Sequence, residues 1–154
     1  MDFGGRYLFG AKRADLWAAL NDVAVLKAVI PGCESIHWTS ERTLDLKIRV
    51  SLGFVHPVFA GDLTLSNVLP AESYTLSGRG KGVMGLAQGA ADIRLTDAED
   101  GTLLSFDAVG KADGRVMALG RTLIGNSAQK VIDGFFGAIG REMGVKVTPL
   151  VRQL

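Results

Sequence analysis

The feature that most constrains the fold is a strict alternation of apolar and polar side chains over residues 43–52, TLDLKIRVSL. Successive side chains of an extended strand point to opposite faces, so this pattern predicts a strand with one buried face and one face in water. The predicted inward set is Leu44, Leu46, Ile48, Val50 and Leu52. One-sided burial of this kind is typical of an antiparallel sheet.

Other extended segments lie before and after this strand, with short turns between them. They are predicted at residues 3–9, from Cys33 onward, and at 58–69, 72–84, 87–97 and 101–112. Strands that follow one another through short turns form an antiparallel meander. The chain therefore predicts one continuous sheet.

Two short helices are predicted between the first two strands, at residues 13–20 and 22–29. Asp22 is a favourable N-cap for the second helix, and Pro31-Gly32 ends it. The stretch VIPGCESI is then the junction between this helix and the next strand, with Val29 and Ile30 facing the mouth of a cavity.

A long helix is predicted at residues 117–143. Its stripe at a spacing of four is Leu123, Ser127, Val131, Phe135 and Ile139. A helix with so broad an apolar face must pack on another element. The economical arrangement is an α+β domain over residues 1–146, with a curved sheet wrapped around this helix and residues 147–154 as a loose tail.

Charge and cysteine content narrow the classes of protein. Seventeen basic and sixteen acidic side chains give a formal net charge of +1, which argues against a nucleic-acid partner. The single cysteine excludes an internal disulfide and fits a reducing compartment. The N-terminus is unlike a signal peptide, and no run of about 18 apolar residues is present, so a cytoplasmic protein is expected.

The chain offers no convincing catalytic group. Cys33 and His37 could pair on one strand face, but no oxyanion-hole or acid motif accompanies them, and a lone buried thiol is common. Two histidines and one cysteine are too few and too scattered for a structural zinc site. We therefore expect no enzyme activity, no metal and no cofactor.

Residues 80–85, GKGVMG, match the G-x-G-x-x-G pattern of dinucleotide-binding proteins. That motif needs a helix directly after it, because the helix N-terminus holds the pyrophosphate. A strand-like segment follows here instead. A hairpin turn is the better interpretation.

Glycines are unusually frequent in the predicted strands. They are Gly61, Gly78, Gly80, Gly82, Gly89 and Gly110. Strand glycines mark bulges, bends or a close approach of the backbone to a ligand. Strong curvature would leave a gap between sheet and helix, although a merely glycine-rich composition is the plainer alternative.

Two predicted turns carry apolar side chains, at residues 51–59 and 82–87. Apolar turns are unexpected unless they border a pocket, meet a membrane or partner, or fold back on the core. We expect both turns near one end of the sheet, beside the start of the long helix.

Several of these segments resemble the CoxG family of carbon monoxide dehydrogenase subunits, which belongs to the START/Bet v 1-like (SRPBCC) superfamily. They are FGGRYLF (3–9), LWAALND (16–22), LKAVIPGCESI (26–36), GRGKGVMGLAQGAA (78–91), GRVMALGRTLI (114–124) and FF (135–136). The resemblance implies a helix-grip fold with a seven-stranded sheet and a hydrophobic cavity. It also implies a non-catalytic role beside a molybdenum-containing carbon monoxide dehydrogenase-type enzyme, with a bound quinone or lipid and a link to the membrane.

We expect this cavity and its mouth to be lined by apolar side chains. The candidates are Ile30, Val50, Leu52, Phe59, Leu63, Val83, Met84, Phe106, Met117, Leu123 and Ile124. Two alternatives stay open. A cyclase-like enzyme would need polar groups inside the cavity, and a protein-interaction or assembly module would have its groove filled by its own side chains.

Overall fold

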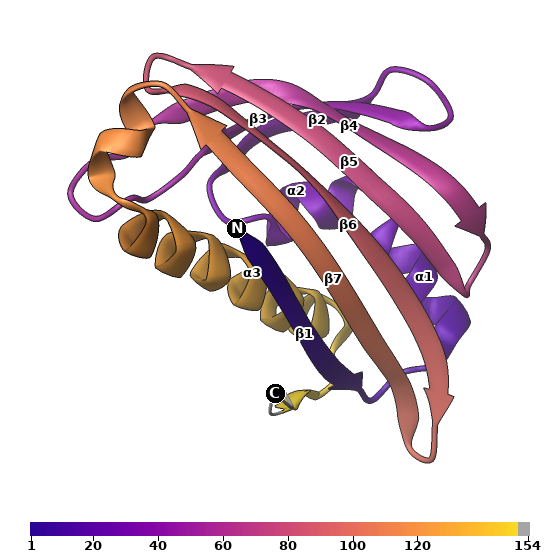
Figure 1. Cartoon of the computed structure of the whole chain (residues 1–154). Coiled ribbons are helices and arrows are strands. Elements are labelled where there is room, and N and C mark those ends of the chain that lie inside the picture. Colours follow the sequence, from indigo (N-terminus) through magenta and orange to yellow (C-terminus); the bar gives the residue numbers. More distant parts are fainter. Residues whose placement is uncertain (151–154) are drawn as a thin grey trace.

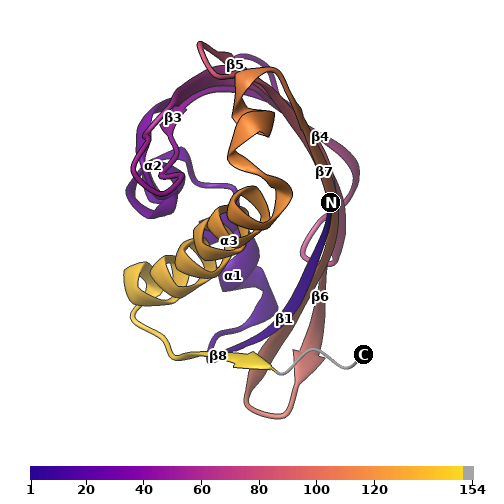
Figure 2. The ribbon, with the colours of Figure 1, turned by 60° about the vertical axis from the view of Figure 1, so that its left-hand side comes forward.

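One antiparallel sheet curves around one long helix in the computed structural model, which describes residues 1–150 (Figures 1 and 2). The elements in chain order are β1 (Asp2–Phe9), α1 (Arg13–Leu20), α2 (Val23–Val29), β2 (Cys33–Trp38), β3 (Thr43–Arg49), β4 (Val58–Leu69), β5 (Ser73–Gly82), β6 (Gly85–Ala98), β7 (Gly101–Asp113), the 3₁₀ helix η1 (Arg115–Leu119), α3 (Arg121–Met143) and β8 (Val147–Leu150). The order across the sheet is β2-β3-β4-β5-β6-β7-β1-β8. The predicted α+β class, the curved antiparallel sheet and the C-terminal helix are confirmed.

The sheet has eight strands in the described residues, where the family resemblance implied seven. The additional strand is β8, which pairs antiparallel with residues 6–9 of β1. Without it, β1 would be an edge strand with unpaired backbone groups, and the β-branched Val147 and Thr148 suit an extended partner. The first half of the predicted loose tail is thus paired, and residues 151–154 lie outside the described residues.

The long helix begins later than predicted. Residues 115–119 form η1, and Gly120, at φ 90°, separates η1 from α3. A positive φ of this size is open to glycine and strained for other residues. The apolar spacing continues through this break, which is why the sequence pattern alone extended the helix to Met117.

The strand with the strict alternation ends at Arg49, three residues earlier than predicted. Leu52 instead pairs with Val55 in an isolated bridge of the loop before β4. Residues 80–85 form the β5–β6 hairpin, as predicted, with Gly82 paired to Gly85. The helix-to-strand junction at VIPGCESI is also as predicted, because α2 ends at Val29 and β2 begins at Cys33.

The core lies between the sheet and the second half of α3. The rings of Tyr7, Phe106 and Phe136 are mutual neighbours, with Tyr7 and Phe136 centroids 4.6 Å apart. The Tyr7 hydroxyl donates to Asp133 Oδ1 of α3, and Gln129 Nε2 donates to the same oxygen at 3.0 Å. Burial and the neighbouring carboxylate raise the pKa of Tyr7, so it stays a protonated donor. These contacts hold the second half of α3 against β1.

Candidate functional site

The concave face of the sheet carries no side chain larger than a methyl group over a wide area. Inward positions of four neighbouring strands are glycine or alanine, and the register places them side by side. Gly61 is opposite Gly80, Gly78 opposite Gly89, and Gly89 opposite Gly110. The alanines among them are Ala87, Ala91, Ala108 and Ala112. The floor under the first half of α3 is therefore almost bare backbone.

An apolar cavity of about 430 Å³ lies between this floor and α3. We call it the outer chamber. Its walls include Val50, Leu52 and Phe59 from the β3–β4 region, Val116 from η1 and Ile124 from α3. Leu52, Val116 and Ile124 form a small core cluster of their own, separate from the main core. This cluster closes one end of the chamber.

A second apolar cavity of about 260 Å³ adjoins it, and we call it the inner chamber. The side chains that border both chambers are Leu63, Leu76, Ala91 and Ala108. The inner walls are rich in rings, which are Trp38, Tyr74, Phe106, Phe135 and Phe136. The two chambers thus lie next to each other between the sheet and α3, and these four side chains border both.

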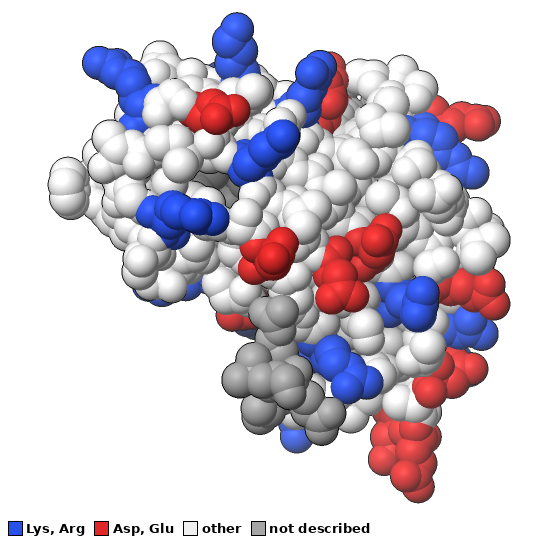
Figure 3. Space-filling model, viewed as in Figure 1, with Lys and Arg blue, Asp and Glu red and all other residues white. Residues whose placement is uncertain are grey.

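The outer chamber opens beside the last residues of β7. β1 begins opposite Val109, so residues 111–113 of β7 have a described strand partner on one side only. The surface is hollowed at this place, between β7 and the end of the molecule that carries η1 (Figure 3). We call this opening the mouth.

The structure places seven of the eleven predicted site residues on the chamber walls. Val50, Leu52, Phe59 and Ile124 line the outer chamber, Ile30 and Phe106 line the inner chamber, and Leu63 borders both. Val29, expected at the mouth, is instead part of the main core.

The other four predicted site residues lie outside both walls. Val83, at the hairpin tip, and Met117, in η1, are exposed, because each belongs to a short segment that projects beyond the sheet. Met84 is partly buried and packs against the Leu52–Val116–Ile124 cluster, but it does not line either chamber. Leu123 faces the loop around Gly53, since α3 turns its Ile124 side toward the chamber.

Sequence reasoning missed the floor and several wall residues. The missed walls are Phe3, Trp38, Tyr74, Val116, Phe135 and Phe136. The strand glycines were the available signal, but their meaning depends on inter-strand register. Only the pairing shows that they converge on one patch.

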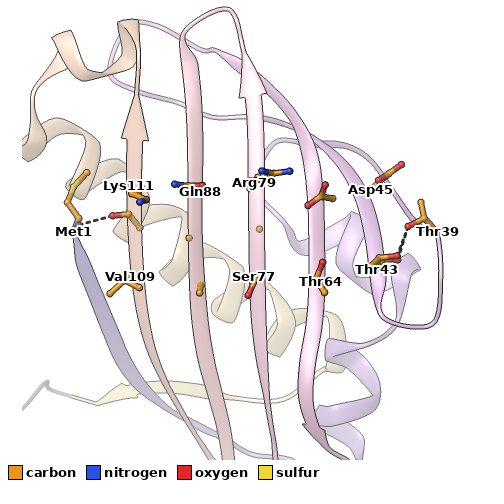
Figure 4. A pocket seen from close by; sticks show the side chains of 15 residues that line it. Met1, Thr39, Thr43, Asp45, Thr64, Ser77, Arg79, Gln88, Val109 and Lys111 are labelled. Atoms are coloured by element: carbon orange, nitrogen blue, oxygen red, sulfur yellow. Dashed lines mark hydrogen bonds between the residues drawn. The ribbon is translucent and has the colours of Figure 1, made fainter.

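A polar trough of about 1030 Å³ occupies the opposite, convex face of the sheet (Figure 4). One row of outward side chains crosses it in register, consisting of Asp45, Asp62, Arg79, Gln88 and Lys111. The neighbouring row carries Thr43, Thr64 and Ser77. Polar side chains make up much of this trough, whereas the two chambers are lined almost wholly by apolar side chains, so the chambers are the better candidate site for an apolar small molecule.

The structure provides no activated nucleophile at Cys33. Burial raises the pKa of its thiol, and Sγ lies 3.5 Å from the Ser35 carbonyl oxygen. A register shift between Cys33 and Ser35 interrupts the strand, and His37 instead lies 3.8 Å from Asp45. Within residues 1–150, no three His, Cys, Asp or Glu side chains are grouped to hold a metal ion.

Comparison with known protein families finds one family that matches most of the chain. The family model for CoxG, a carbon monoxide dehydrogenase subunit, matches residues 5–144. No curated protein matches the chain.

Across the described residues, no helix is both long and apolar enough to cross a membrane.

Solved structures with a similar fold are numerous. A conserved protein from Geobacillus kaustophilus has a TM-score of 0.87 and 23% identity, covering 96% of this chain and 99% of that one. Ara h 8.0201 has a TM-score of 0.67 and 14% identity, covering 94% and 98%. The Zhui aromatase/cyclase from Streptomyces sp. R1128 has a TM-score of 0.64 and 14% identity, covering 94% and 93%. With its Bet v 1-like fold and a match over nearly its whole length, the chain belongs to the CoxG family of carbon monoxide dehydrogenase subunits.

Proposed function

We propose that the protein is a non-catalytic carrier of a hydrophobic ligand, a quinone or a lipid, that serves a molybdenum-containing carbon monoxide dehydrogenase-type enzyme. The observation that carries this proposal is the pair of adjoining apolar chambers over a floor of glycine and alanine. Family membership supports the link to the enzyme. The combined size of the chambers falls in the range typical of small-molecule sites.

Apolar burial would supply the binding energy. Each 100 Å² of apolar ligand surface removed from water contributes about 2.5 kcal/mol, against the cost of ordering the ligand. An isoprenoid or acyl chain presents several such areas, whereas a small polar metabolite does not. The chambers therefore favour a long apolar molecule.

The walls of the inner chamber argue against the cyclase-like alternative. Among the described residues that line the inner chamber, none is charged, and Asn21 and Tyr74 are the clearest polar side chains. General acid–base catalysis needs a group that titrates near the working pH. Burial raises the pKa of Tyr74 further above that range. These features support a binding role.

Native mass spectrometry of the protein from its own host, followed by solvent extraction, tests the proposal. We expect a mass increase that matches one bound quinone or lipid per chain, with the same compound in the extract. A clean apo mass, together with no uptake of added quinone, would contradict the carrier role. That result would favour an interaction or assembly module.

We further propose peripheral contact with the cytoplasmic face of the membrane. Phe54, Val83 and Met117 are 91%, 81% and 40% exposed. They project from the β3–β4 loop, the β5–β6 hairpin and η1. Side chains from these three segments pack together in or against the Leu52–Val116–Ile124 cluster.

Basic side chains gather at this same end of the molecule, and acidic side chains at the opposite end near the β6–β7 hairpin (Figure 3). Lys81, Arg115 and Arg121 belong to the segments around the exposed apolar side chains. Apolar side chains among basic ones match a bilayer with anionic headgroups. A carrier docked in this way would have its mouth close to the lipid.

The double variant Phe54→Asp, Val83→Asp is expected to bind vesicles containing phosphatidylglycerol at least tenfold more weakly, measured by co-sedimentation. Each substitution removes apolar burial and adds a charge repelled by the lipid. The matched control is Leu69→Asp, at the far end of the sheet, where Leu69 is 56% exposed. Equal vesicle binding by both variants would overturn the proposed contact.

A further inference from the structure

Tyr74 is a buried side chain whose ring packs in the core but whose hydroxyl has no hydrogen-bond partner among the described residues. It lies on the inward face of β5, lines the inner chamber and is 6% exposed. Its hydroxyl forms no hydrogen bond with any residue in the described range 1–150. The other tyrosine, Tyr7, is hydrogen-bonded to Asp133. Tyr74 therefore differs from a tyrosine that only ties core elements together.

An unpaired hydroxyl in an apolar interior costs free energy. No completely enclosed side-chain oxygen or nitrogen in the described part of the chain lacks a partner. The Tyr74 hydroxyl is thus not completely enclosed, and it borders open space. The space that its side chain lines is the inner chamber.

The surroundings keep Tyr74 in place and protonated. Trp17 of α1 meets its ring edge to face, with centroids 5.2 Å apart and planes at 88°. Ile93 of β6 is its cross-strand partner. Burial raises the pKa of the phenol, so the hydroxyl remains a donor at every physiological pH.

The rest of the inner chamber is suited to a flat apolar group. Trp38, Phe106, Phe135 and Phe136 present rings to it. The Asn21 side-chain amide is engaged with the Trp17 carbonyl oxygen at 2.9 Å. Tyr74 thus adds a fixed hydroxyl donor to walls made mainly of aromatic and aliphatic surface.

We propose that Tyr74 is the specificity-determining residue of the cavity: its hydroxyl donates a hydrogen bond to a carbonyl oxygen on the ring of the ligand. The ring occupies the inner chamber, and the apolar chain runs through the outer chamber toward the mouth. This inference rests on the proposed carrier function and deepens it, because it selects ring carbonyl compounds over hydrocarbons and simple acyl chains. A hydrogen-bonding site discriminates strongly against analogues that lack its partner, since the buried group is then left unpaired.

The test uses two probes that differ in their carbonyl groups, 2-methyl-1,4-naphthoquinone and 2-methylnaphthalene. We expect Tyr74→Phe to weaken quinone binding about tenfold by calorimetry, as expected for the loss of one hydrogen bond. Binding of the hydrocarbon should change less than about twofold, because phenylalanine keeps the ring and its packing. Thermal unfolding of both proteins controls for folding.

Infrared spectroscopy gives a second readout that a packing role would not move. A carbonyl stretch of bound quinone should lie at lower frequency in the wild type than in Tyr74→Phe. Equal losses for both probes, or no loss for the quinone, would overturn the role of Tyr74 while leaving the carrier function intact. Failure of the wild type to bind either probe would overturn this inference, whereas the native mass spectrometry described above tests the carrier function separately.

Discussion

Replacing Ala108 by phenylalanine is expected to abolish ligand binding while the protein stays folded. Ala108 borders both chambers, at the place where they join. A phenyl ring there would occupy space that the ligand needs and would separate the inner chamber from the mouth. Because the added ring enters an existing cavity, overpacking should be small. Titration with a short-chain quinone should show at least a hundredfold loss of affinity, about 2.7 kcal/mol.

The matched control is Asp107→Phe, one residue earlier on the outward face of β7. It adds the same ring to the same strand without entering either chamber. We expect it to bind the quinone like the wild type. If Ala108→Phe also bound normally, the chambers would not be the ligand site, and the assignment of the walls would be wrong.

Gly61→Ala is expected to lower the free energy of unfolding by more than about 3 kcal/mol, beyond the usual cost of overpacking. A Cβ at this position would overlap the carbonyl oxygen of Arg79 on the neighbouring strand. That oxygen belongs to backbone and has no rotamer with which to move away. Relief of the overlap would require β4 and β5 to separate where they pair Gly61 with Gly80. Urea unfolding measures the loss.

Gly110→Ala provides the comparison on the same floor. Its Cβ would lie 3.6 Å from the Phe3 ring and 3.7 Å from the Gln88 carbonyl oxygen, which are ordinary contacts. We expect a change within about 1 kcal/mol, since alanine also reduces the freedom of the unfolded chain. Similar unfolding curves for the two variants would show that strand pairing at Gly61 is looser than the structure indicates.

Much of the fold followed from local patterns. The alternation in residues 43–49 and the N-cap at Asp22, which accepts from Ala24 N and Val25 N, are short-range features that a single segment determines. The start of α3 could not be found in this way. The helical spacing crosses Gly120 without a break, and the positive φ there is visible only in the structure.

The sequence predicted an apolar cavity, but it identified only some of the residues that line it. Apolar side chains such as Phe59, Leu63 and Ile124 could be identified as wall candidates from their periodicity. The floor could not, because it consists of missing side chains that converge through register across four strands. Tyr74 was hidden for a related reason. In the sequence it is one more inward residue of a strand, and only its place on the chamber wall, with no hydrogen bond to another described residue, sets it apart.

The glycine floor also bears on how this protein can change over evolutionary time. At Gly61 and Gly82 a Cβ would collide with neighbouring backbone, so these positions are closed to substitution. At Gly110 there is room for a methyl group. The depth of the chamber can therefore change by a methyl-sized step at Gly110 while the sheet keeps its shape. Homologous proteins could therefore accommodate ligands of different width without a change in the sheet that forms the cavity.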